Sequence, residues 1–224
     1  MAAGKYSNQP ISCVVAITDG KKFTDSKMDF MTELVDFTAN HPTTESMKEH
    51  TDTKYFPKYY DSAWISQCKE HYPNITLTST PSTSEGEAEL FDVYDLQVAF
   101  NEDPSKTSEI PLVHIFNWTD FEAVELGDLE KICKQIEIFN GRAGLESLPT
   151  IHCTAGVGRT GVIGIALCLR DPKDQNSLES LLREARKARP ETVQSEAQFL
   201  VLAELANKHQ KNWLCQVKRN PSPR

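Results

Sequence analysis

The sequence predicts a single α/β or α+β domain. The chain has 224 residues, which is enough for one sizeable hydrophobic core. Its hydrophobic fraction of 39% and charged fraction of 25% are those of an ordinary globular protein. Short β-branched runs alternate with segments of helical periodicity, and neither an internal repeat nor a clear domain boundary interrupts them.

The order of elements follows from periodicity and from turn signals. Short runs rich in β-branched residues predict buried strands, and the last of them enters a Gly-rich turn. Apolar residues at helical spacing predict amphipathic helices. The expected strands cover 12–17, 75–79, 91–100, 112–116 and 149–152. The expected helices cover 28–39, 62–70, 128–139, 159–169, 177–188 and 196–208, with loops at 41–53 and 80–88.

Charge and cysteine usage exclude several classes of function. A net charge of −8 argues against a nucleic-acid partner. The six cysteines are scattered, without metal-ligand spacing, so neither a zinc site nor a disulfide framework is expected. Cys13, Cys133 and Cys168 are expected to be small buried hydrophobes. The chain shows no signal core and no membrane span, and we expect a reducing, cytoplasmic compartment.

Residues 151–161 carry the strongest chemical signal, reading I-H-C-T-A-G-V-G-R-T-G. Backbone N–H groups of a strand–loop–helix turn converge as an anion-binding nest, and the start of the next helix adds its positive end. Gly156 and Gly158 allow unusual dihedrals and close backbone approach. Arg159 offers a fork for two phosphate oxygens, and the same positive field favours a nucleophilic thiolate at Cys153. The expected phosphate-binding backbone is Thr154, Ala155, Gly156, Val157 and Gly158.

This segment resembles the signature of protein tyrosine phosphatases, His-Cys-x-x-Gly-x-x-Arg-Thr-Gly, with every fixed position matched. The resemblance implies a central mixed, highly twisted β-sheet flanked by helices, and catalysis without metal or cofactor. It also implies Cys153 as nucleophile, Arg159 as phosphate ligand and Thr160 as a hydroxyl that hydrogen-bonds the thiolate. His152 would tune the thiolate's surroundings. Dual-specificity phosphatases share this loop, so it defines the chemistry better than the substrate.

A general acid is expected upstream, because protonation of the leaving oxygen speeds its departure. Asp120 follows a strand in Phe-Asn-Trp-Thr-Asp, which resembles the family's mobile Trp-Pro-Asp loop, with Trp118 as its anchor. Asp120 could instead be a turn or cap residue. Thr119 replaces the family's proline, which frees φ and should change the open–closed balance of the loop and so the rate.

Residues 189–199 resemble the glutamine loop of the phosphotyrosine-specific branch. Gln194 would position the water that attacks the phosphocysteine, Gln198 would support it, and Asp120 would then act as base. Alone, both glutamines would be ordinary surface residues near a helix start. Dual-specificity enzymes generally lack this loop, so it favours a phosphotyrosine substrate.

The resemblance extends over about 12–206, and the expected organisation has three parts. These are a flexible N-terminus at 1–11, a phosphatase-like domain at 12–208 that is shorter than the family at its start, and a basic tail at 209–224. The family's tyrosine-bearing recognition loop has no match. Three functions therefore stay open: hydrolysis of phosphotyrosine in proteins, a pseudophosphatase that binds such proteins, and a dual-specificity or lipid phosphatase. The expected partners are phosphotyrosine-containing proteins, and the sequence leaves the oligomeric state open.

Overall fold

The structure is a computed structural model that describes residues 10–18, 73–82, 90–116, 118–144 and 147–212. The chain divides into two compact units. A sheet unit comprises Met1–Asp120 with Lys134–Ala155, and a helical unit comprises Phe121–Cys133 with Gly156–Arg224. The helices expected at 28–39 and 62–70 and the loop expected at 41–53 lie outside the described residues.

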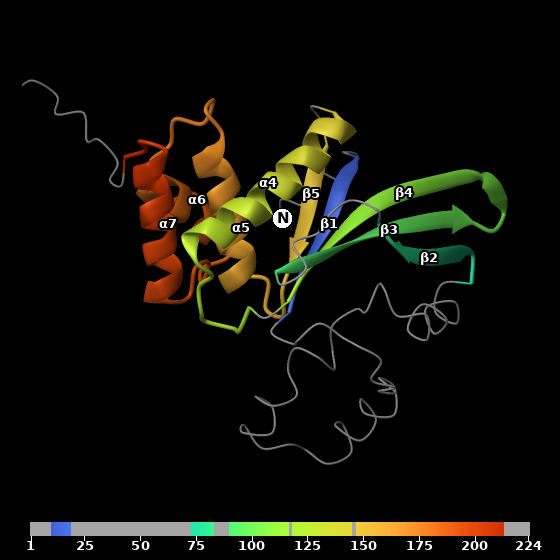
Figure 1. Ribbon diagram of the computed structural model, residues 1–224, viewed down its shortest axis with the longest axis horizontal. Helices are drawn as coiled ribbons and strands as arrows, with labels where there is room; N and C mark the ends of the chain where they lie inside the picture. Colours follow the sequence, from blue (N-terminus) through green and yellow to red (C-terminus); the bar gives the residue numbers. More distant parts are fainter. Residues whose placement is uncertain (1–9, 19–72, 83–89, 117, 145–146, 213–224) are drawn as a thin grey trace, which may run out of the picture. The chain divides into compact units, whose positions relative to one another are not determined.

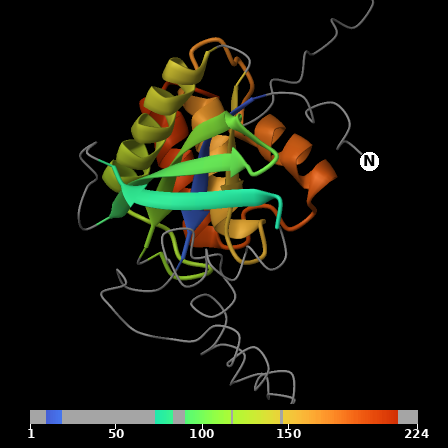
Figure 2. The same ribbon diagram turned by 90° about the vertical axis from the view of Figure 1, so that its right-hand side faces the viewer.

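The sheet unit is built on five strands, seen in Figure 1, in the order β2-β3-β4-β1-β5. The strands are β1 (Ile11–Ile17), β2 (Ile75–Pro81), β3 (Phe91–Phe100), β4 (Asp103–Ile115) and β5 (Leu148–His152). Central β1 pairs in parallel with β4 and β5, whereas β2, β3 and β4 pair antiparallel, so the sheet is mixed. Figure 2 shows β2 beside β3 at the outer end of the sheet. Ala16 and Ile17 point to opposite faces of the sheet and are both buried, as expected of a central strand.

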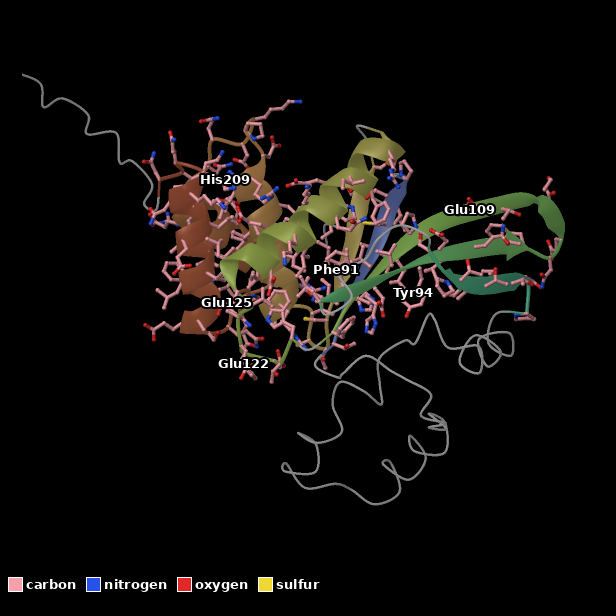
Figure 3. The ribbon with its side chains drawn as sticks, viewed as in Figure 1. Phe91, Tyr94, Glu109, Glu122, Glu125 and His209 are labelled. Atoms are coloured by element: carbon pink, nitrogen blue, oxygen red, sulfur yellow. The ribbon has the colours of Figure 1, made fainter. Side chains whose placement is uncertain are left out.

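The hairpin of β3 and β4 is longer than the sequence pattern predicts. The strand expected at 112–116 is only the last part of β4, which begins at Asp103 and pairs with β3 over almost its whole length. Figure 3 marks Phe91 and Tyr94 on β3 and Glu109 on β4. Pro111 is tolerated because β1 pairs with β4 only from Leu112 onward, so the preceding part of β4 has one partner strand among the described residues.

Helix α4 (Leu126–Ala143) confirms the helix expected at 128–139 and crosses from the helical unit into the sheet unit. In the sheet unit, Ile136 and Phe139 are buried on one side of the helix. Ser12 of β1 donates a hydrogen bond to the Asn140 side chain, which fixes this end of α4 against the sheet. The predicted combination of a mixed sheet and helices is therefore confirmed.

The helical unit contains α5 (Gly158–Arg170), α6 (Leu178–Ala188) and α7 (Glu196–Lys208), close to the predicted ranges. Helix α5 contacts both α6 and α7. Ser177 and Ser195 cap α6 and α7 by accepting hydrogen bonds from backbone N–H groups in the first turns. None of the helices in the described ranges has the length and apolar content needed to cross a membrane.

The cysteine predictions hold in two of three cases. Cys13 and Cys133 are fully buried, whereas Cys168 is only half-buried. Burial raises the pKa of Cys13 to about 11, against a smaller opposing effect of the hydrogen bond with Ser12. Cys13 is therefore a neutral core residue and a poor nucleophile.

Candidate active site

The cysteine loop connects β5, the last strand of the sheet in chain order, to helix α5. Strand β5 ends at His152, Cys153 follows it, and α5 begins at Gly158. Cys153 is buried, whereas Thr154 and Ala155 are exposed. The sheet unit ends at Ala155, and the rest of the loop belongs to the helical unit.

The segment of the expected acid leaves the same edge of the sheet as Cys153. Strands β4 and β5 both run parallel to β1, so their carboxyl ends emerge together. After β4, the backbone N–H of Trp118 donates to the carbonyl of Thr18 at 3.2 Å, and the Trp118 side chain is fully buried. Asp120 is half-buried and lies in a turn. Active sites of open parallel sheets form at this edge.

A row of polar side chains crosses the sheet beside Cys153. By strand register, Asp92 pairs with His114, His114 pairs with Ala16, and Ala16 pairs with His152. Residues in register share one face of a sheet, and the small Ala16 side chain separates the two imidazoles. The hydroxyl of Thr18 and Nε2 of His114 are hydrogen-bonded at 3.1 Å.

Both histidines in this row favour the neutral form. Burial lowers the pKa of His114 to about 4; the nearby Asp92 carboxylate opposes that shift, and His152 adds to it. Burial also lowers the pKa of His152. Sequence reasoning identified His152 but missed His114, whose only signal was a histidine inside the apolar run Leu-Val-His-Ile-Phe.

In the helical unit, α5 starts without a side-chain cap. Its N-cap residue is Val157, whose side chain carries no hydrogen-bonding group. The first N–H groups of any helix lack acceptors within the helix, so an uncapped start is suited to an anion. Arg159 in the first turn is completely buried, and Thr160 beside it is half-buried. A buried guanidinium needs acceptors around it, and an oxyanion supplies them bidentately.

The two expected glutamines lie directly against the start of α5. A methyl group placed on Gly158 would come within 2.5 Å of Oε1 of Gln194 and 3.2 Å of Nε2 of Gln198. Glycine at position 158 therefore allows the two glutamine side chains to approach the backbone of α5 closely. Its role differs from that of Gly156, which alone among the described loop glycines has a positive φ, of 71°. Oε1 of Gln194 is buried without a hydrogen-bond partner among the described residues.

The side-chain amide of Gln198 is hydrogen-bonded to backbone groups of two other residues. It is completely buried, and its Oε1 accepts a hydrogen bond from the backbone N–H of Gln194 at 2.9 Å. Its Nε2 donates to the carbonyl of Glu122 at 3.2 Å, in the segment that leads into α4 and is labelled in Figure 3. Gln198 therefore links the segment after Asp120 to the backbone of Gln194.

Comparison with known proteins gives one family and several relatives. The family model "Protein-tyrosine phosphatase" matches residues 42–208. The secreted effector protein SptP of Salmonella typhi is 28% identical over 163 residues, covering 69% of this chain and 28% of SptP. The tyrosine-protein phosphatase YopH of Yersinia pseudotuberculosis serotype I is 31% identical over 153 residues, covering 60% of this chain and 32% of YopH. The aligned region thus spans less than a third of the length of either relative.

Solved structures show the same fold. A structure of PTPN18 in complex with HER2 phosphopeptides matches with a TM-score of 0.57 at 14% identity, covering 92% of this chain and 60% of that one. At this level of identity the likeness concerns the fold alone.

Proposed function

Because the chain belongs to the protein-tyrosine phosphatase family, we propose that it hydrolyses phosphotyrosine in proteins through a covalent phosphocysteine. The observation that carries the proposal is the cysteine loop: a buried Cys153 directly after a strand, then an uncapped helix start with a buried Arg159. YopH, a relative, is by name a tyrosine-protein phosphatase, which supports the same reaction for this chain. The reaction needs a reduced thiol, which fits the cytoplasmic compartment expected from the sequence.

In the first half-reaction, Sγ of Cys153 attacks phosphorus and the bond between phosphorus and the tyrosine oxygen breaks. Asp120 gives its proton to the departing phenolate oxygen. Arg159 and the N–H groups of residues 154–158 hold the phosphate oxygens and stabilise the charge that develops on them. The hydroxyl of Thr160 hydrogen-bonds the sulfur. Because burial favours the neutral form of His152, the positive charge that stabilises the thiolate comes from Arg159 and from the start of α5.

In the second half-reaction, a water attacks phosphorus and the bond between sulfur and phosphorus breaks. Asp120, now a carboxylate, takes a proton from that water, and the thiolate of Cys153 leaves. We assign the placing of the water to the amide of Gln194, and the fixing of the Gln194 backbone to Gln198. The hydrogen bond between these two glutamines and the contact of both with Gly158 support the assignment.

The test is phosphate release from a phosphotyrosine peptide by the wild type, Cys153→Ser and Asp120→Asn side by side. Cys153→Ser should abolish turnover, and Asp120→Asn should lower kcat by about 10²-fold or more. A phosphoserine peptide and a phosphoinositide serve as parallel substrates, and faster turnover of either would replace the phosphotyrosine assignment. Undetectable turnover by a well-folded wild type would overturn the enzymatic proposal.

A second candidate function is phosphotyrosine binding without turnover. The observation in its favour is Thr119, which stands where the family's acid loop carries proline. This function predicts that the wild type binds a phosphotyrosine peptide, that Arg159→Met does not, and that neither releases phosphate. Ordinary turnover by the wild type would exclude it.

A further inference from the structure

Two arginines at the end of α6 hold backbone carbonyl groups in and beside the cysteine loop. Nη1 of Arg189 donates a hydrogen bond to the carbonyl oxygen of Gly156 at 3.1 Å. Arg186 donates two, from Nε to the carbonyl of Thr192 at 3.0 Å and from Nη2 to that of Val193 at 3.1 Å. All five residues belong to the helical unit.

The fork of Arg186 holds a strained residue in place. Val193 has a φ of 62°, and a β-branched residue in the left-handed region costs about 1–3 kcal/mol. Arg186 binds the carbonyls of both peptide planes that flank Val193, and those two planes define its dihedral angles. The strained conformation aims the N–H of Val193 at the carbonyl of Val157, with an N···O distance of 3.2 Å.

Arg189 and Val193 together bind two successive carbonyls of the cysteine loop, those of Gly156 and Val157. In a planar trans peptide, the N–H of the next residue points opposite to the carbonyl. The N–H groups of Val157 and Gly158 therefore point away from the segment 189–193. Successive N–H groups held in this way form an anion-binding nest at the start of α5.

We propose that Arg186 and Arg189 are positioning residues of the phosphate site, because they orient the peptide groups that follow Gly156 and Val157. The inference rests on the proposed function, since a phosphate oxygen is the ligand for which these N–H groups are oriented. Neither arginine is assigned a contact with substrate. The guanidinium of Arg189 packs directly against Gly156. A methyl group on Gly156 would come within 2.5 Å of Nη1 of Arg189, so there is no room for a side chain at this position.

A role in stability alone predicts a different outcome from a role in positioning. Arg189 is exposed, and a single hydrogen bond from an exposed side chain contributes little to the free energy of unfolding. Loss of the Arg189 side chain should therefore leave Tm almost unchanged. Loss of the oriented N–H groups should instead weaken the binding of a tetrahedral anion.

The experiment measures the affinity of tungstate, an unreactive tetrahedral dianion, for the full chain by calorimetry. The parent protein is Cys153→Ser, so that the measurement does not depend on turnover. Added to it are Arg189→Met, Arg186→Met and the matched control Arg183→Met, which removes an arginine of the same helix that pairs with Glu179. We expect a Kd about tenfold weaker for the first two and unchanged for the control.

The lysine variants separate positioning from charge. Arg189→Lys supplies one donor for one carbonyl and should recover most of the affinity, whereas Arg186→Lys cannot form the fork to two carbonyls and should not. Equal tungstate affinity of Arg189→Met and the parent would overturn the inference and leave the proposed function intact. A parent that binds no tungstate would overturn both. If Arg186→Met fails to fold, Arg189→Met decides the question.

Discussion

A methyl group on Gly158 offers a direct test of the role proposed for Gln194. In Gly158→Ala, the new carbon would lie 2.5 Å from Oε1 of Gln194, whereas ordinary contact begins at 3.4 Å. The amide oxygen must therefore retreat by 3.4 − 2.5, or about 0.9 Å. The atom that must move most is the end of the flexible Gln194 side chain, whereas the amide of Gln198, at 3.2–3.3 Å, need shift by only a few tenths of an ångström, so the cost in folding free energy should be small. Alanine is also the better helix former, by about 1 kcal/mol.

The consequence should appear in the second half-reaction. A catalytic group displaced by about 1 Å can cost on the order of 10²-fold in rate. Because Gln194 is assigned to the attacking water, hydrolysis of the phosphocysteine should slow while its formation continues. Stopped-flow measurements with p-nitrophenyl phosphate should then show a burst of about one nitrophenolate per enzyme, followed by a slow steady state.

The matched control is Gly164→Ala in the same helix, where a methyl group would meet nothing within 4 Å. This variant should keep the wild-type kcat and gain a few degrees in Tm. Gln194→Ala should reproduce the burst of Gly158→Ala. If Gly158→Ala folds well and turns over at the wild-type rate without a burst, the packing of Gln194 against Gly158 has no part in catalysis and the assignment is wrong.

Three further predictions concern stability. Gly161→Ala should lower the free energy of unfolding by about 1–3 kcal/mol in urea titration, because its methyl group would lie 2.5 Å from Cγ2 of Thr192 and 3.2 Å from the Val193 backbone; unchanged stability would contradict this packing. Ser177→Ala should cost about 1 kcal/mol through loss of the α6 cap, whereas Ser180→Ala should not. Burial lowers the pKa of His114 to about 4, below its unfolded value of 6.5. The unfolded chain therefore binds the extra proton first, and stability is lost as pH falls from about 6.5 toward 4, by up to about 3 kcal/mol. His114→Gln should flatten that profile, and an unchanged slope would assign the loss to other groups.

Local patterns were sufficient for most of the fold. Every strand and helix expected between residues 91 and 208 is present, because their apolar residues recur at the period of a strand or a helix and their ends carry turn or cap residues. The long β4 is the exception. Its first part, Asp-Pro-Ser-Lys-Thr-Ser-Glu, is polar and carries no strand period, and it is extended because β3 pairs with it.

In the candidate site, too, local sequence patterns predicted some residues, whereas others are placed by the tertiary fold. The residues of the cysteine loop are contiguous in sequence, so their chemistry could be predicted from one string. His114 could not, since its place beside His152 depends on strand register across Ala16. Arg186 and Arg189 could not either, because they bind main-chain carbonyls, which every residue has and no sequence pattern marks.

The glycines of the cysteine loop show why the signature contains more than the chemistry requires. A nest for phosphate needs a left-handed residue, and Gly156 alone provides it among the described loop glycines. The other two glycines instead leave room for the glutamine loop, residues 189–199. Gly158 leaves room for the amide of Gln194, and Gly161 leaves room for the side chain of Thr192. The backbone that would hold phosphate and the residue that would place the water are therefore packed against each other without an intervening side chain. A change in either segment should move the other, so substitutions in the two are not expected to be additive.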